Sequence, residues 1–455
     1  MRVCKNEFER LTQVESFIKS HFPYFGVNKK QEITRLLYEI SKKNNISPAK
    51  IIEKNEVRDY ESLKKSLLKG RYPFASLQSE PLKPHLPKIE LKASAQCDFR
   101  KKIFYPKNIY VENKVSGSYL ACRLKAVFPK AHFYEIGSLK EYILAHAPFG
   151  VKDYNRRQDA LFIVNENYDF FKNCPCTHSA LNCGYHIFNL GFGCIYECNY
   201  CFLQGYANAP GIILTANIEK FFDEFNAYKR NGMRLGTGEF SDSLALDEIT
   251  EHSLALIEFF REHKGVTFEF KTKSVKIENL MKSKASRNII VSWSLNPQKI
   301  IDGNEFLAPS LNERLEAAAK CARAGYRVGF HFDPIIYFNS WEKEYASVVE
   351  NIFSKIEPRD IAWISLGTFR FSPSLRQVIE RRFPENTILN EELLLGFDNK
   401  LRYPYALRYL LYKKMLTMLR QQSKQLKVYL CMEETPMWKE LNLGMPAKEG
   451  SDLEM

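Results

Sequence analysis

Three cysteines in one short stretch are the residues of this chain best suited to chemistry. Cys194, Cys198 and Cys201 lie in GFGCIYECNYCFLQG, separated by three residues and then by two. Three thiolates on one loop can bind three irons of a cubane cluster and leave the fourth iron open, whereas a closed structural zinc site uses four ligands. The spacing therefore predicts a metal-binding loop with an open coordination position. The alternative is a packed group of unreactive cysteines.

The other cysteines are unevenly distributed. Of the 11 cysteines in the chain, six fall between residues 174 and 201. Such clustering in a long chain favours metal binding over disulfides. Cys174, Cys176 and Cys183 precede the three-cysteine loop, and a second metal on them is a hypothesis that the pattern leaves open. The five isolated cysteines are expected to be small buried apolar side chains; they are Cys4, Cys97, Cys122, Cys321 and Cys431.

The elements around the cysteine loop alternate between strand-like and helix-like patterns. Apolar, β-branched segments predict strands, and segments of period 3.6 between them predict helices. The predicted strands cover residues 185–192, 233–240, 266–273, 288–296, 326–335 and 361–369. Six successive strand–helix units indicate a parallel sheet and fit an open, partial (β/α)6 barrel.

Chemistry in such barrels collects at the carboxyl ends of the strands. Besides the cysteine loop, the polar residues expected there are Glu239, Ser241, Asp242, Lys273, Ser294, Asp333 and Arg370. Structural roles are also open, since Ser241 and Asp242 precede a predicted helix and would suit its N-cap. Lys273 would suit a surface position, and Arg370 a structural ion pair.

The rest of the chain predicts further parts around the barrel. Residues 1–76 read as a basic helical accessory region, and the proline-containing segment 77–102 reads as a linker. Strand and helix patterns in 103–184 predict a small α/β extension. The barrel would then occupy 185–430, and 431–455 would be a C-terminal segment and tail.

Composition limits the classes of partner and location. The net charge of +13, with a pI near 9.0, favours an anionic partner such as nucleic acid. General solubility is the alternative explanation. No apolar run reaches the ~18 residues of a membrane span, and the first residues, MRVCKNEFERLTQ, lack the apolar core of a signal peptide. We therefore expect a cytoplasmic protein without a membrane segment.

Several longer motifs carry a resemblance to a known family. They are GCIYECNYCFLQGYANAPGIILTANIEKFF, GEFSDSLALDEITEHS, FEFKTKSV, VSWSLNPQKII, LNERLEAAAKCARAGYRVGFHFDPII, SWEKEYASV and FRFSPSLRQVIERRFP. Together they resemble spore photoproduct lyase and its relatives in the radical S-adenosylmethionine (SAM) superfamily. The resemblance covers about residues 105–420 and leaves the basic N-terminal hundred residues outside.

The resemblance implies the cofactors and the residues that bind them. A [4Fe-4S] cluster would be held by Cys194, Cys198 and Cys201, and SAM would chelate its free iron. One-electron cleavage of SAM would give a 5′-deoxyadenosyl radical, with flavodoxin or ferredoxin as the electron donor. The positions that match SAM-binding residues of the family are Tyr200, Ser241, Asp242, Lys273 and Ser294.

Two positions depart from the family pattern. Glu239 stands where the DNA-repairing lyase has a cysteine that gives a hydrogen atom to the substrate radical. Phe202 replaces a tyrosine of the same relay. Cys431, at the end of a predicted late strand, is a candidate for the missing donor, and Arg370 matches a substrate-facing arginine.

Three functional hypotheses follow from these residues. The first is a radical SAM lyase that repairs a pyrimidine dimer lesion in DNA. The second is a radical SAM enzyme that acts on RNA or protein, which the loss of the donor cysteine favours. The third is a non-catalytic iron–sulfur protein that binds nucleic acid, although such a protein would have no need of a SAM pocket. No pattern in the sequence predicts the oligomeric state.

Overall fold

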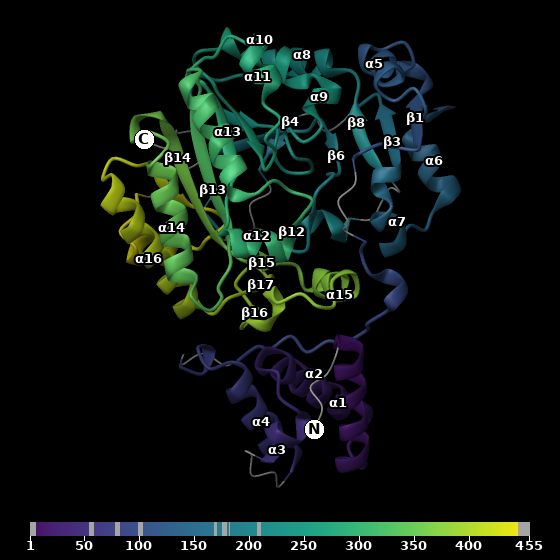
Figure 1. Cartoon of the computed structure of the whole chain (residues 1–455), viewed down its shortest axis with the longest axis vertical. Coiled ribbons are helices and arrows are strands. Elements are labelled where there is room, and N and C mark those ends of the chain that lie inside the picture. The colour runs from purple at the N-terminus through teal and green to yellow at the C-terminus, as the bar shows by residue number, and fades with distance from the viewer. Residues whose placement is uncertain are drawn as a thin grey trace. The chain divides into compact units, whose positions relative to one another are not determined.

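The chain forms two compact units, which are described separately (Figure 1). The computed structural model describes residues 6–53, 59–77, 82–98, 103–167, 171–174, 180–181, 183–206 and 211–444. Unit 1 comprises Met1–Cys97, Ile336–Asn339 and Thr368–Leu411. Unit 2 comprises Asp98–Ile335, Ser340–Gly367 and Tyr412–Met455.

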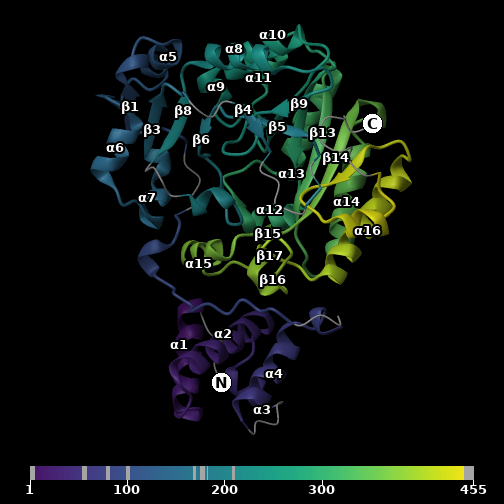
Figure 2. The same cartoon turned by 180° about the vertical axis from the view of Figure 1, so that it is seen from behind.

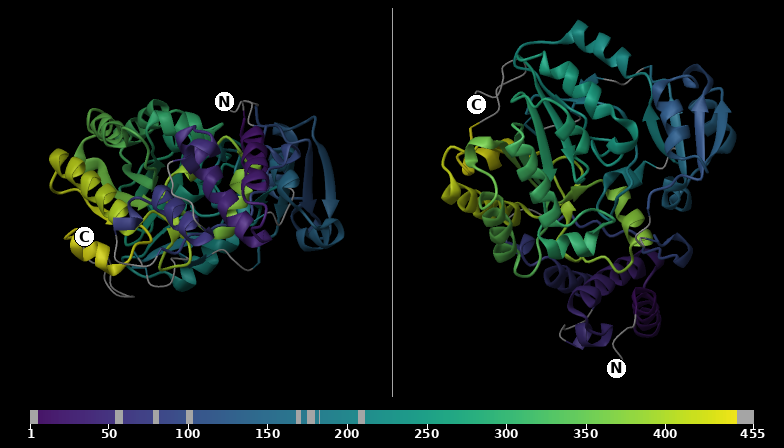
Figure 3. Two further views of the ribbon diagram at one scale, coloured as in Figure 1. Left: turned by 90° about the horizontal axis from the view of Figure 1, so that it is seen from below. Right: turned by 45° about the horizontal axis from the view of Figure 1, so that its top comes forward.

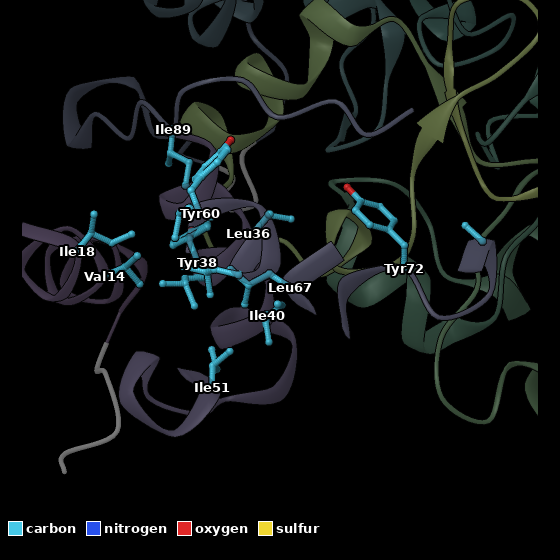
Figure 4. Close-up of a cluster of buried hydrophobic side chains, with 14 residues drawn as sticks. Val14, Ile18, Leu36, Tyr38, Ile40, Ile51, Tyr60, Leu67, Tyr72 and Ile89 are labelled. Atoms are coloured by element: carbon cyan, nitrogen blue, oxygen red, sulfur yellow. The ribbon is translucent and has the colours of Figure 1, made fainter. Parts of the chain in front are cut away.

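Unit 1 is built on four N-terminal helices: α1 (Glu7–His21), α2 (Val27–Asn44), α3 (Pro48–Glu53) and α4 (Tyr60–Arg71). Their apolar residues recur at helical spacing and meet in one core, where Val14, Leu36 and Leu67 are among the buried side chains (Figure 4). The segment after the helices is not an exposed tether. Ile89 is buried in the same core, and Pro84 forms a β-bridge with Leu394.

Buried ion pairs tie the segment Thr368–Leu411 into unit 1. This segment contributes α15 (Pro373–Arg382) and a small sheet of β15 (Arg370–Phe371), β16 (Leu394–Leu395) and β17 (Leu401–Arg402). Glu39 of α2 binds Arg71 at 2.6 Å and also binds Arg376 of α15. Unit 1 therefore joins residues from three of the predicted parts, 1–76, 77–102 and 185–430, into one compact body.

Unit 2 is built on an eight-stranded sheet that follows the predicted alternation. The strand order is β18-β14-β13-β11-β10-β9-β5-β4. Strands β5, β9, β10, β11 and β13 are parallel neighbours, β18 is parallel to β14, and β4 is antiparallel to β5. The bounds are β4 Phe171–Asn173, β5 Tyr185–Phe188, β9 Arg234–Gly236, β10 Thr267–Thr272, β11 Ile289–Ser294, β13 Arg327–Ile335, β14 Ile361–Thr368 and β18 Val428–Leu430.

Helices alternate with these strands along the chain (Figure 2). They are α8 Ile218–Tyr228, α9 Asp247–Thr250, α10 His252–Arg261, α11 Glu278–Lys282, α12 Gln298–Asn304, α13 Leu311–Arg323, α14 Trp341–Phe353, α16 Tyr405–Gln422 and α17 Thr435–Glu440. Helix α13 shows why the elements form where they do. Ser310 and Glu313 make a capping box at its start, and its buried Leu315 and Ala318 lie on the face that packs against β11 and β13.

The eight-stranded sheet curls far enough for distant strands to meet. Arg234 of β9 donates a hydrogen bond of 2.8 Å to the hydroxyl of Tyr429 on β18, although four other strands lie between them in the sheet order. Beyond the edge strands, Ala180 and Glu434 form an antiparallel bridge. A flat sheet would keep such residues far apart, since neighbouring strands are about 4.8 Å apart. The predicted partial (β/α)6 barrel is confirmed.

A second, five-stranded sheet of unit 2 contains three strands of the α/β extension, residues 103–184, together with β6 and β8 from outside those bounds. Its order is β2-β1-β3-β8-β6, and it lies on the right in both panels of Figure 3. Its strands are β1 Asn108–Glu112, β2 His132–Ile136, β3 Ala160–Val164, β6 Gly191–Phe192 and β8 Ile212–Thr215, with helices α5 Tyr119–Val127, α6 Leu139–His146 and α7 Val151–Asn155.

One predicted strand, 185–192, is wrong in its extent. Residues Tyr185–Phe188 belong to the barrel sheet, but Gly191–Phe192 belong to the five-stranded sheet, where they pair with β8. Gly191 makes this change of direction possible, because its φ of 149° brings its α-carbon against β8. A Cβ there would lie 2.2 Å from the carbonyl oxygen of Ile213. Among the described residues, no helix combines the length and hydropathy needed to cross a lipid bilayer.

Candidate active site

The three-cysteine loop is held at its base by both sheets of unit 2. Strands β6 and β8, which flank the loop in the sequence, pair antiparallel with each other. Inside the loop, β7 (Glu197–Cys198) pairs antiparallel with β12 (Glu305–Phe306), so that Cys198 lies opposite Glu305. The backbone N–H of Gly193 also donates to the carbonyl of Phe240, which follows barrel strand β9. The loop is therefore fixed at its start and in its middle.

Arg157, from the α/β extension, secures the middle of the loop. Its side chain is 2% exposed and donates to the carbonyl oxygens of Cys194 at 3.0 Å and Tyr196 at 2.7 Å. It also forms an ion pair with Glu197. Sequence reasoning missed this residue, because nothing in the local pattern links position 157 to a loop about 40 residues later.

The three cysteines of the loop belong to one apolar cluster. Cys198 is buried, and Cys194 and Cys201 are partly buried against Tyr196 and Ala245. Burial raises the pKa of Cys194 to about 12, helped by the negative charge of Asp242, and burial raises that of Cys198 well above its usual range. Metal binding would therefore have to displace protons from these thiols.

The donor set fits an iron–sulfur cluster in type and number. Three thiols on one loop, in an apolar surrounding, match three ligands of a cubane. Within the described part of the chain, no three His, Cys, Asp or Glu side chains already converge as a metal site.

A buried carboxylate organises the residues beside the loop. Glu305 forms an ion pair of 2.6 Å with Arg314, and both side chains are 0% exposed. It also accepts hydrogen bonds from the Tyr200 hydroxyl and from Asn296 at 2.9 Å. Burial favours the neutral acid, but Arg314, Lys273 and these hydrogen bonds lower the pKa of Glu305 to about 2. Glu305 is thus an anion that fixes Tyr200.

Lys273 places a positive charge near the cysteine loop. Its Nζ lies 5.7 Å from the centre of the Tyr200 ring. Burial acts to lower its pKa, but the negative charges of Glu305 and Cys198 outweigh burial, and the pKa is raised. Lys273 forms no ion pair with any residue that the structure describes. This ammonium can therefore receive an anionic group of a ligand.

Asp242 acts through the backbone around it. One carboxylate oxygen accepts from the N–H groups of Leu244 at 3.1 Å and Ala245 at 2.9 Å. It also accepts from Thr272, and the other oxygen accepts from the N–H of Lys273 at 2.7 Å. The carboxylate thus joins the turn after β9 to the end of β10, a structural role close to the capping alternative.

The two predicted serines lie at different points of the site. Ser241 lines a small cavity together with Cys194 and Asp242. Ser294 ends β11, is 7% exposed, and accepts from Arg314 through its carbonyl oxygen at 3.0 Å. Ser241, Asp242, Lys273 and Tyr200 are all brought to the loop. Ser294 is connected to them through Arg314.

An aromatic group borders Glu239. The rings of Phe202 and Tyr206 are 6.0 Å apart, and each lies 6.3 Å from the ring of Phe240. Lys172 of β4 lies over Phe240 at 4.5 Å and 3.9 Å from the Glu239 carboxylate. Glu239 is thus an acid next to a lysine and beside an aromatic group.

The remaining predicted residues belong to other elements of the chain. Cys431 directly follows β18, and its N–H donates to Leu366 at 2.7 Å, so it lies at the carboxyl end of the sheet as expected. Arg370 belongs to unit 1, where it pairs with Arg402 in the small sheet. Cys174 and Cys183 belong to no metal-binding group among the described residues, and Cys176 lies outside them.

Comparison with known proteins identifies the relatives of this chain. The family model for spore photoproduct lyase matches residues 169–430, more than half of the chain. Spore photoproduct lyases of Bacillus subtilis (strain 168) and Geobacillus sp. (strain Y412MC61) are 29% and 28% identical to it, over 209 and 206 residues. Each alignment covers 44% of this chain and 61% or 60% of the relative, so it spans about three fifths of their length.

Solved structures show the same fold. Spore photoproduct lyase complexed with dinucleoside spore photoproduct has a TM-score of 0.61 and 23% identity. A mutant with bound AdoMet and dinucleoside spore photoproduct has a TM-score of 0.62 and 22% identity. These matches cover 72% and 73% of this chain and 100% of the other. The fold is the partial barrel of the radical SAM superfamily. Within that superfamily, the chain belongs to the spore photoproduct lyase family.

Proposed function

We propose that this protein is a radical SAM enzyme whose cluster is held by Cys194, Cys198 and Cys201. The observation that carries the proposal is the ammonium of Lys273, charged and without an ion pair among the described residues, beside Tyr200 and near Cys198. A structural loop would not need a free cation at this place. A cosubstrate with a carboxylate would use it.

Each residue near the loop has a role in binding SAM. When bound, the cluster and SAM supply one-electron cleavage to a radical that removes a hydrogen atom from the substrate. Lys273 pairs with the methionine carboxylate, and the Tyr200 ring forms a wall that Glu305 holds in place. Asp242 is a positioning residue, because its carboxylate holds the backbone on both sides of the pocket. Ser241 and Ser294 complete the SAM contacts.

The proposed substrate is a pyrimidine dimer lesion in DNA. Two relatives of known structure are described with dinucleoside spore photoproduct. The net charge of +13 suits a polyanion, and the guanidinium of Arg370 suits a phosphate. The proposal includes flavodoxin or ferredoxin as the electron donor and a cytoplasmic location.

A second candidate, a substrate other than DNA, is favoured by the residues near Glu239. The carboxylate beside Lys172 gives no hydrogen atom comparable to that of a thiol, and Phe202 has no hydroxyl. For the DNA lesion, the hydrogen atom would come from another thiol, and we propose Cys431 at the carboxyl end of β18.

The test uses anaerobically reconstituted full-length protein with SAM, dithionite and an oligonucleotide that contains the spore photoproduct. We expect 5′-deoxyadenosine and recovered thymine, with both products absent in Cys198→Ala. Cys431→Ala should then lose thymine recovery and keep 5′-deoxyadenosine formation. The variant Glu239→Cys, which restores the thiol of the family, should raise thymine recovery per 5′-deoxyadenosine formed.

Each failure has a distinct meaning. Formation of 5′-deoxyadenosine without thymine in the wild-type protein and in Glu239→Cys would contradict the DNA lesion and support another substrate. Absence of both products, in protein that binds the cluster, would contradict radical SAM chemistry. Nucleic-acid binding without either product would favour the non-catalytic alternative.

A further inference from the structure

The N-terminal part of unit 1 carries most of the net positive charge of the chain. Residues 1–97 contain 19 Lys and Arg against 11 Asp and Glu, so about a fifth of the chain holds eight of its thirteen net charges. This region lies outside the family match at 169–430. Its charge therefore needs an explanation apart from the chemistry of the barrel.

The charge gathers where α1 and α2 meet. No Asp or Glu occurs from residue 16 to residue 31, while Lys19, Lys29 and Lys30 lie in this window. None of these three lysines forms an ion pair in the described part of the chain. By contrast, Lys43 and Lys64 of the same unit pair with Glu391 and Glu32 at 2.6 and 2.7 Å. The turn between the two helices thus presents uncompensated positive charge.

An aromatic side chain projects from the same turn. Tyr24 is 98% exposed and Val27 is 83% exposed, although both are large apolar residues. The neighbouring rings are packed, since Phe22 and Phe25 stack at 5.0 Å and Phe25 meets Tyr60 edge-on at 5.6 Å. Phe22 and Phe25 are partly buried and pack against the core of unit 1.

The turn is also braced by polar contacts. The ammonium of Lys30 donates to the carbonyl of Pro23 at 2.8 Å, and the ammonium of Lys29 lies 4.7 Å from the centre of the Tyr60 ring. Tyr24 therefore projects from a supported turn. A supported aromatic side chain loses little conformational entropy when it binds a flat ligand.

We propose that this turn binds single-stranded nucleic acid, with Tyr24 stacking on a base and Lys19, Lys29 and Lys30 contacting phosphates. Aromatic stacking together with a basic surface is the combination by which proteins bind unpaired strands. The absence of acidic residues from the turn removes the repulsion that a phosphate backbone would otherwise meet. The site does not depend on the proposed radical chemistry.

Fluorescence anisotropy of full-length protein with labelled dT15 and U15 tests the proposal. We expect Tyr24→Ala to weaken binding roughly tenfold, within the range of one stacked base, and Tyr24→Phe to keep the affinity. Tyr228→Ala is the matched control, since Tyr228 is 65% exposed at the end of α8 in unit 2. The oligonucleotide that binds with the higher affinity, dT15 or U15, shows whether DNA or RNA is the preferred ligand.

The lysines have a separate readout in the salt dependence. Replacing Lys29 and Lys30 by Ala should lower the magnitude of the slope of log affinity against log salt by about 1.4, as expected for two lost contacts to a single strand. Equal affinity of Tyr24→Ala and Tyr228→Ala for both strands would overturn the proposal. So would an unchanged salt slope. Thermal unfolding of each variant confirms that the fold is retained.

Discussion

A lysine, a tyrosine and a glutamate set the electrostatics beside the cysteine loop. Glu305 stays ionised although it is buried, because Arg314 and Lys273 lower its pKa to about 2. Its charge in turn helps to keep Lys273 protonated. The fixed Tyr200 donates to the carboxylate and packs in the same cluster as the cysteines. The ammonium of Lys273 is therefore open to a ligand, while the charge of Glu305 is balanced by Arg314.

Lys273→Met is expected to weaken SAM binding by about 10- to 100-fold, since a hydrogen bond to a charged group contributes about 1.5–3 kcal/mol. Isothermal titration with SAM on cluster-loaded protein measures the loss. The cluster absorbance should be unchanged, because the cysteines remain. Lys276→Met is the control, as Lys276 pairs with Glu248 at 2.6 Å at a more exposed position. Equal affinities of the two variants would contradict the role of Lys273.

His252 is expected to make the stability of unit 2 depend on pH. Burial lowers its pKa from 6.5 to about 4, against a weaker opposite effect of a hydrogen bond with the Thr215 backbone. Below pH 6.5 the His252 ring becomes protonated in the unfolded chain, whereas in the folded chain it stays neutral until the pH is much lower. Stability should therefore fall as pH decreases from 6.5 to 4, by no more than about 3 kcal/mol.

Denaturant unfolding at a series of pH values between 4 and 7 measures this effect. In His252→Gln the acid-dependent loss should shrink, because the titrating ring is gone. His146→Gln, which alters an exposed histidine of α6, serves as the control. The same pH dependence in both variants would show that other groups cause it.

The short pair of antiparallel strands β7 and β12 determines where the middle of the cysteine loop lies. Cys198 and Glu305 are opposite each other in this pair. Arg314 of α13 reaches Glu305 and also the carbonyl of Ser294 on β11. A helix, a barrel strand and the cysteine loop are therefore connected through one guanidinium.

Arg314→Met is expected to cost about 3–5 kcal/mol, because it leaves the buried carboxylate of Glu305 without its main partner. Denaturant unfolding of unit 2 measures the cost. Adding Glu305→Gln should recover part of it, since the unpaired charge is then removed. Arg323→Met on the same helix, at an exposed position, should have little effect. A loss in the double variant equal to the sum of the single losses would contradict this coupling.

The alternation of the barrel could be predicted from the sequence because each strand is nearly uniformly buried. The residues of β11 and β14 are all buried, which gives continuous apolar runs between amphipathic helices. The short strands β6, β7, β8 and β12 were not predicted individually. They have two to four residues each, and long-range pairing rather than local pattern makes them strands.

The candidate site was predictable only where residues lie at strand ends or in the loop. Lys273 and Asp242 follow from the strand ends, and the three cysteines follow from their spacing. Glu305 and Arg157 could not be predicted as site residues, because each contacts the loop from a distant segment. The sequence does not show that a charged residue is buried until its partner is known.

Unit 1 as a whole joins the N-terminal residues, up to Cys97, to segments that lie about 240 residues or more later in the chain. Glu39 lies among Arg35, Arg71 and Arg376, and burial favours its neutral form, but the three arginines lower its pKa to about 2. Arg35 also binds Glu380 of α15. The N-terminal helices and α15 are thus joined by charges that are excluded from water, and neither part buries them alone.

Glu39→Gln is expected to destabilise unit 1 by about 3–5 kcal/mol, since three buried guanidiniums lose their common anion. Hydrogen exchange measures the effect by segment. Protection should fall together in α2 and α15, while β10 and β11 of unit 2 stay unchanged. Glu15→Gln, at an exposed position of α1, is the control. Loss of protection in α2 alone would show that the two segments do not unfold together.

The composition of unit 1 has a consequence for how the protein is made on the ribosome. Helices α1 to α4 emerge before their charged partners on α15 and the adjoining segment up to Leu411, which follow about 300 residues later. At about 5–20 residues per second, the interval is on the order of 15 to 60 seconds. During that time Glu39 lacks Arg376 as a partner and Arg35 lacks Glu380, so these buried ion pairs are incomplete. A nascent chain that has not yet reached α15 would therefore lack the ion pairs that join α2 to α15.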